Sequence, residues 1–199
     1  MSLPFAELAK LTERLDRADE RGLAVSALAC LDRCVPLLEY VEYNGADGFV
    51  GLDADADAGV APPAVDTHAA LRPLWEAAEG GEAWLGRLRR AAADVVRTAA
   101  PTDFGPAAAL RRAADVPRVY EPEALRRWAT ECSAASLAVH RHLDGDRDAG
   151  PLATGELRRQ ERLLDLLAGG GDGLRAVMAQ SDEGKRVLRA AAARRARRR

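Results

Sequence analysis

Residues 21–43, RGLAVSALACLDRCVPLLEYVEY, decide the fold that the sequence predicts. Apolar side chains occupy most of the circumference of a helix drawn through this stretch, which is typical of a helix buried on all sides. Pro36 has no amide hydrogen, so we expect it to remove one backbone hydrogen bond and kink the helix. The stretch therefore predicts a central, buried helix around which the rest of the chain packs.

Helical periodicity continues on both sides of this stretch. Leucines three and four residues apart predict a helix over 4–19, with Pro4 in its first turn. The remaining predicted helices cover 66–79, 81–99, 106–115, 122–143 and 154–168, and short helical pieces at 172–180 and 182–196 complete the chain. The one strand-like segment, GFVGL at 48–52, is too short to build a sheet. We therefore predict an all-α domain of seven or eight helices over 1–183, followed by a basic tail over 184–199 that is helical or frayed.

Length and composition favour one ordinary globular domain. The chain has 199 residues, of which 48% are hydrophobic and 30% charged. No apolar stretch approaches the roughly 18 residues that span a bilayer, and the first ten residues lack the pattern of a secretion signal. The three cysteines are an odd number, which favours free thiols and a reducing compartment. We therefore expect a cytoplasmic protein without a membrane segment.

The charges divide unevenly along the chain. Residues 184–199 hold eight basic side chains and no acidic one, so the rest carries 29 − 8 = 21 basic against 31 acidic residues, a net charge of −10. This acidic remainder disfavours a broad nucleic-acid-binding face and suits a basic protein partner. The tail could fray, fold back on the acidic remainder, or bind nucleic acid or acidic lipid, although it has no aromatic side chain for base stacking. Its candidate residues are Arg194, Arg195, Arg197, Arg198 and Arg199.

An acidic segment lies in the longest stretch without helical periodicity, 44–64. Asp53, Asp55 and Asp57 occupy alternate positions, as at the start of a calcium-binding EF-hand loop. Counted from Asp53, however, position 6 is Ala58 instead of glycine and position 12 is Ala64 instead of glutamate. We therefore interpret the three aspartates as an acidic contact loop and not as a metal site.

Histidine and cysteine spacings do not predict a metal site either. His140 and His142 point about 200° apart on a helix, so they cannot share a metal ion. Cys30 and Cys34 lie one turn apart, but zinc needs four ligands, and small buried side chains are the expected role. We therefore expect no metal and no cofactor.

Three stretches together carry a resemblance to a known family. They are LACLDRCVPLLEYV at 28–41, LRPLWEAA at 71–78 and ECSAASLAVHRHLDGD at 131–146. In this order they resemble the uncharacterised bacterial family called domain of unknown function 416, although the aspartates at 53–57 depart from its pattern. The resemblance implies an all-helical fold of similar length. It implies no activity and no catalytic residue.

No nucleophile, base and orienting group come together in the sequence. We therefore predict a non-enzymatic protein-interaction or regulatory protein, of a kind that includes immunity proteins, with an unknown partner. The alternative is an enzyme or small-molecule-binding protein whose pocket lies between the predicted helices 21–43, 66–79 and 122–143. Its candidate pocket residues are Trp75, Glu76, Cys132 and His140. The arrangement around His140 distinguishes the two hypotheses, because a ligand site requires it to line a cavity.

Overall fold

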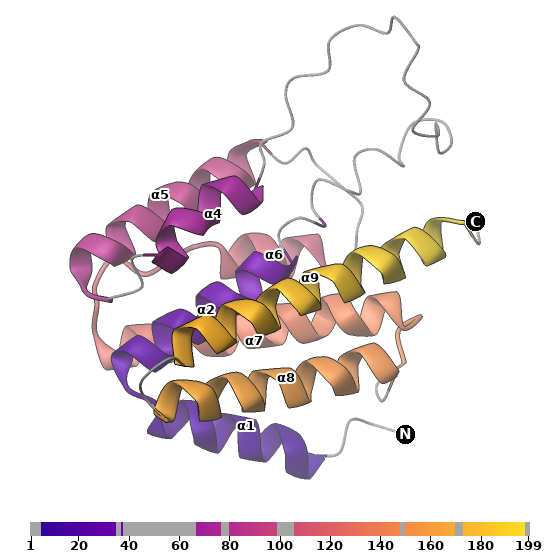
Figure 1. The fold of residues 1–199 in the computed structure, drawn as a ribbon, viewed down its shortest axis with the longest axis horizontal. Coiled ribbons are helices and arrows are strands. Elements are labelled where there is room, and N and C mark those ends of the chain that lie inside the picture. Colours follow the sequence, from indigo (N-terminus) through magenta and orange to yellow (C-terminus); the bar gives the residue numbers. More distant parts are fainter. Residues whose placement is uncertain are drawn as a thin grey trace, which may run out of the picture.

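The computed structural model describes residues 5–34, 37, 67–76, 80–98, 106–147, 150–169 and 173–197. In these ranges all the regular structure is helical, which confirms the all-α prediction (Figure 1). The eight helices within these ranges are α1 (Phe5–Arg17), α2 (Glu20–Cys34), α4 (Thr67–Glu76), α5 (Glu82–Thr98), α6 (Ala107–Ala113), α7 (Pro122–Leu143), α8 (Pro151–Ala168) and α9 (Gly173–Ala196). None of these helices is long and apolar enough to cross a membrane.

Helix α2 lies at the centre, as its apolar circumference predicts. Every residue from Gly22 to Cys34 is buried. The helix packs against α4, α6, α7, α8 and α9, with α9 on the near side of it in Figure 1 and α7 behind. The bend expected at Pro36 lies outside the described residues. Because α2 is surrounded by other helices, any charged side chain on its inner turns must find its partners inside the protein.

The other helices form two groups around α2. Helices α1 and α8 lie side by side below α7, whereas α4 and α5 form an antiparallel pair at the opposite edge (Figure 1). Buried indoles join neighbouring helices. Trp84 Nε1 on α5 donates to the Leu74 carbonyl on α4 at 3.0 Å, and Trp128 Nε1 on α7 donates to the Ala113 carbonyl on α6 at 2.7 Å. The tryptophans therefore pack in the core with their N–H groups satisfied.

The turn between α7 and α8 is held by one carboxylate. Asp144 accepts hydrogen bonds from the backbone N–H groups of Leu152, at 3.3 Å, and Ala153, at 2.9 Å. These are donors of the first turn of α8, which have no partner within the helix. A side chain at Gly150 would overlap Asp144, so glycine is required there. This cap explains why α8 begins at Pro151 and not at the predicted residue 154.

Helix α9 is continuous from Gly173 to Ala196, whereas the sequence predicts two pieces over 172–180 and 182–196. Ser181 and Gly184, which weaken a helix in isolation, both face inward here: Ser181 bonds to Asp32, and Gly184 packs against Arg33. Near its end, Arg195 Nη1 donates to the His142 carbonyl at 2.6 Å, which attaches the helix to the end of α7. The tail is therefore helical and held in place as far as residue 196.

Candidate functional site

Two adjacent charged residues lie near the end of α2, and both are buried. Asp32 and Arg33 are each 1% exposed. A buried charge is strongly unfavourable unless it is paired and hydrogen-bonded. The two side chains reach partners on different helices, so they form two groups, which we call the Asp32 cluster and the Glu156 cluster.

The Asp32 cluster joins α2 to α4 and α9. Asp32 Oδ2 accepts hydrogen bonds from Ser181 Oγ at 2.9 Å and Trp75 Nε1 at 3.2 Å. Lys185 Nζ lies 3.0 Å from the same oxygen and 2.8 Å from Asp182 Oδ1. Lys185 is itself only 5% exposed, so its ammonium group belongs to the interior. The carboxylate therefore holds three helices together through charge-assisted hydrogen bonds.

The Glu156 cluster joins α2 to α7 and α8. Glu156 Oε1 accepts hydrogen bonds from Arg33 Nη2 at 2.5 Å, Ser136 Oγ at 2.8 Å and Gln160 Nε2 at 2.9 Å. Glu156 Oε2 accepts a fourth from Arg159 Nη1 at 2.8 Å. Three of these four hydrogen bonds fall on Oε1 and one on Oε2, and all four donors come from within the fold.

The charges of this cluster fix its protonation. Burial alone would raise the pKa of Glu156, but Arg33, His140 and Arg159 outweigh it and hold that pKa well below its usual range. Burial would lower the pKa of Arg33, and the Glu156 carboxylate reverses this and raises it. Both side chains therefore stay charged, as a salt bridge with no exposed atoms.

His140 completes the Glu156 cluster. Its Nδ1 lies 2.8 Å from the Ser136 carbonyl, which can only accept, so Nδ1 carries a hydrogen. Its Nε2 lies 3.4 Å from Glu156 Oε2 and has no hydrogen-bond partner among the described residues; the same is true of Arg33 Nε and Nη1. Burial lowers the pKa of His140, with Arg33 and Arg159 adding to this effect and Glu156 opposing it. The ring is therefore neutral near pH 7.

The three thiols are shielded from reaction. Cys30, Cys34 and Cys132 are free and buried, and burial raises the pKa of each, that of Cys30 to about 12. Their hydrogen-bond partners are structural, such as Ser136 Oγ for Cys34 at 3.3 Å. Nucleophilic attack and metal binding both need the thiolate, which is suppressed here. The described residues contain no group of three or more His, Cys, Asp and Glu side chains placed to hold a metal ion.

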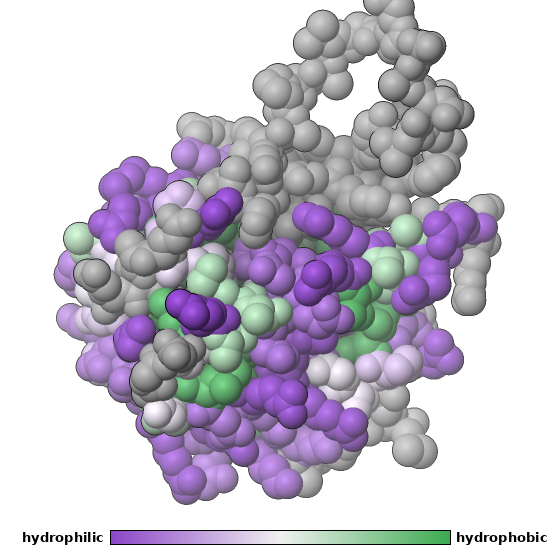
Figure 2. Space-filling view, in the orientation of Figure 1, coloured by the Kyte–Doolittle hydropathy of each residue, from purple (hydrophilic) through white to green (hydrophobic). Residues whose placement is uncertain are grey.

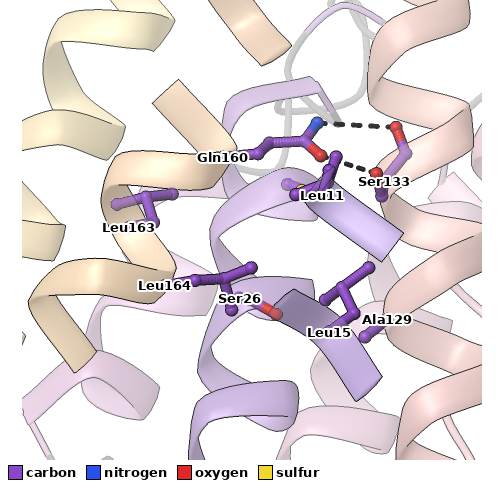
Figure 3. Close-up of a pocket in the computed structure, with 9 residues that line it drawn as sticks. Leu11, Leu15, Ser26, Ala129, Ser133, Gln160, Leu163 and Leu164 are labelled. Atoms are coloured by element: carbon purple, nitrogen blue, oxygen red, sulfur yellow. Dashed lines mark hydrogen bonds between the residues drawn. The ribbon is translucent and has the colours of Figure 1, made fainter. Parts of the chain in front are cut away.

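A small cavity lies beside the Glu156 cluster, between α1, α2, α7 and α8 (Figure 3). At its rim, Ser133 Oγ donates to Gln160 Oε1 at 2.6 Å, and Gln160 Nε2 lies 3.5 Å from the Ser133 carbonyl. The cavity has room of about 10 Å³ for a water-sized molecule, so it fits one water. Its lining consists of Leu11, Leu15, Ser26, Cys30, Ala129, Ser133, Gln160, Leu163 and Leu164. His140 is outside this set and packs within its cluster.

The candidate pocket residues have different hydrogen-bond partners in the structure. Trp75 belongs to the Asp32 cluster, His140 belongs to the Glu156 cluster, and Cys132 faces the carbonyl of Ala113, the last residue of α6. The position of the Glu76 side chain, of Arg198 and Arg199, and of the aspartates at 53–57 lies outside the described residues. Three of the predicted tail residues, Arg194, Arg195 and Arg197, lie at the end of α9.

Sequence reasoning did not single out the residues that organise the interior. They are Asp32, Arg33, Glu156 and Lys185. The available signal was an adjacent acid and arginine inside an otherwise apolar helix, together with one of only two lysines in the chain. Comparison of the chain with protein-family models, curated proteins and solved structures finds no match. The resemblance to domain of unknown function 416 therefore stays a prediction.

Proposed function

We propose that this protein acts by binding another protein through its surface and that its buried charges hold the binding scaffold together. The observation that carries the proposal is the Glu156 carboxylate, which has no exposed surface and accepts four hydrogen bonds from inside the fold. A general base or a metal ligand needs a free lone pair that a substrate or ion can reach. We therefore assign the Glu156 cluster a structural role.

The two clusters together suit a rigid scaffold. Through Asp32 and Glu156 they connect α2, α4, α7, α8 and α9. A polar network that links several helices favours one arrangement of them, because each bonded group loses a partner if a helix shifts. A surface held in one arrangement loses little conformational entropy when it binds, which favours affinity and specificity.

The charge balance supports a basic protein as the partner. The chain outside residues 184–199 carries a net charge of −10, and Asp53, Asp55 and Asp57 concentrate part of it in one segment. Complementary charge raises the rate of association and excludes partners of the same sign. The same balance disfavours a broad nucleic-acid-binding face. We therefore propose the three aspartates as part of the contact with this partner.

A second candidate function is small-molecule binding or catalysis between α2, α4 and α7. The observation in its favour is the set of unsatisfied buried atoms, His140 Nε2, Arg33 Nε and Arg33 Nη1. A polar ligand that formed hydrogen bonds with these atoms would gain binding free energy, because buried polar atoms without a partner are unfavourable. The one-water volume of the neighbouring cavity and the raised pKa values of the thiols favour the first proposal over this one.

Affinity capture from the native host tests the protein-binding proposal. The baits are the wild-type chain, a D53S/D55S/D57S variant and a control variant with three other acidic residues replaced, D115S/E123S/E131S. The three control positions are exposed. We expect a basic protein to be retained by the wild type and the control and lost from the first variant, and the purified partner to bind the wild type in calorimetry.

Two other outcomes contradict parts of this proposal. Equal recovery of the same partner by all three baits would remove the aspartates from the contact. If the wild type recovers no protein that binds again after purification, the protein-binding function itself is wrong.

A further inference from the structure

We propose that the exposed side of α9 near its end binds a short acidic segment of a partner protein. This surface, which we call the α9 basic face, consists of Arg189, Arg194 and Arg197, all of which are exposed. The inference goes beyond the proposed function, because it assigns a second contact surface whose charge is opposite to that of the acidic segment.

The helix that carries this face is fixed to the rest of the molecule. Leu188 is fully buried, and Ala191 and Ala192 are 6% and 7% exposed. Arg195 donates to the His142 carbonyl at 2.6 Å and so ties the last turn of α9 to the end of α7. The arginines therefore project from a backbone already held in place, and a partner need not order it on binding.

The arrangement of the face leaves its arginines available. Ala190 and Ala193 lie between them, and side chains this small allow a partner's backbone to approach the helix. Residues 189 to 197 span about 12 Å of helix, which matches two turns of a second helix. An arginine binds a carboxylate through two parallel hydrogen bonds, so glutamates or aspartates three and four residues apart on such a helix would suit this face.

Nearby carboxylates are already engaged. On α9 itself, Asp182 lies 2.8 Å from Lys185, and Glu183 lies 3.1 Å from Arg186. In the turn that follows α7, Asp144 accepts two backbone N–H groups of α8. In Figure 2 the tip on the right, where α9 ends, is largely purple, with a green hydrophobic patch just inside it. These carboxylates therefore bond to groups other than Arg189, Arg194 and Arg197.

The same observations favour a protein over a nucleic acid as the acidic partner. A nucleic acid extends its phosphates beyond a 12 Å patch (about two helical turns) and would meet the net charge of −10 carried by the rest of the chain. Helix α9 also offers no aromatic side chain for stacking against bases. A short acidic segment of a protein, in contrast, can contact the three arginines without extending over the acidic surface.

Fluorescence anisotropy with the purified full chain tests this inference. One probe is a labelled peptide of about 15 residues with glutamates three and four positions apart, and the other is a labelled DNA duplex of about 15 base pairs. The wild type is compared with R189E/R194E/R197E and with the control R90E/R127E/R158E, which changes the charge equally on α5, α7 and α8, where all three arginines are exposed. Circular dichroism establishes that each variant is folded.

We expect the wild type to bind the peptide, the α9 variant to bind it at least about tenfold more weakly and the control to stay within about twofold, because rim charges act locally. Equal weakening by both variants, absence of peptide binding, or tighter binding of the duplex than of the peptide would overturn the inference. The basic host partner captured by the wild type distinguishes the two proposals. If R189E/R194E/R197E still retains that partner, the protein-binding function stands, whatever the result with the peptide.

Discussion

Arg33 and Glu156 form an ion pair at 2.5 Å in which neither side chain has exposed surface. Removing one partner of such a pair leaves an uncompensated charge in the interior, which typically costs about 3–5 kcal/mol. We therefore expect Glu156→Gln to lower the free energy of unfolding by about that amount. Urea titration followed by circular dichroism measures it.

The control for this substitution is Glu131→Gln, at an exposed position of α7. Its expected effect is within about 0.5 kcal/mol, as for most surface substitutions. Equal midpoints for the two variants would show that the Glu156 cluster does not stabilise the fold.

His140 gives the stability a characteristic pH dependence. Its pKa in the folded protein is lower than the ordinary value of 6.5, so below pH 6.5 the unfolded chain takes up a proton that the folded protein does not. Stability therefore falls with acidification in this range, by up to about 1.4 kcal/mol per pH unit. Glu156 adds a further loss of stability at lower pH, because its pKa is depressed in the folded protein. On acidification the carboxyl of the unfolded chain therefore takes up a proton before the carboxyl of the folded protein does.

We expect His140→Gln to flatten the dependence between pH 6.5 and 5, whatever its effect on stability at pH 7. Urea midpoints collected across this pH range provide the comparison. A slope that His140→Gln leaves unchanged would mean that another group carries the dependence.

The sequence shows which residues are apolar but not which charged residues meet. Asp32 and Arg33 are visible as an unusual pair in an apolar helix, yet Ser181 and Glu156 are 149 and 123 positions away along the chain. Partners at such separations converge only through the packing of helices. For the same reason, the sequence could not show whether Trp75 and His140 lie in one pocket. In the structure they belong to different clusters.

Packing between elements is closest where α9 crosses α2. A methyl group on Gly184 would overlap the Arg33 side chain, so the helices approach this closely only because residue 184 is glycine. We expect Gly184→Ala to destabilise the protein by about 1–3 kcal/mol, as overpacking does. Thermal unfolding followed by circular dichroism measures the change.

Gly155→Ala is the matched control, because Gly155 also lies inside a helix and nothing is within 4 Å of where its Cβ would be. Alanine favours a helix over glycine by about 0.5–1 kcal/mol, so this variant should be slightly more stable than the wild type. If both alanines stabilise, the α2–α9 contact is looser than described.

Helix boundaries are predictable where local signals act alone. The range 122–143 predicted from periodicity is that of α7, with Pro122 in its first turn. The prediction fails where a distant contact overrides the local signal: Asp144 caps α8 from across the turn, and Asp32 and Arg33 accommodate the residues that would interrupt α9. These contacts cannot be read from local sequence.

At the scale of the whole molecule, α2 connects most of the helices to one core. It packs against α4, α6, α7, α8 and α9. We expect unfolding in urea to be a single transition, with tryptophan fluorescence, which reports on α4, α5 and α7, changing together with the helical signal in circular dichroism. Separate transitions by the two probes would show that the α4–α5 pair unfolds independently.

The central claim is a division of roles, in which buried charges hold the scaffold and surface charges bind. The measurement that tests it most directly is the affinity of the acidic peptide for folded Glu156→Gln and for R189E/R194E/R197E. We expect the first variant to lose stability but keep its affinity within about twofold, and the second to keep its stability and lose affinity about tenfold. Loss of binding in folded Glu156→Gln, with R189E/R194E/R197E binding normally, would contradict the account and place the function at the buried cluster.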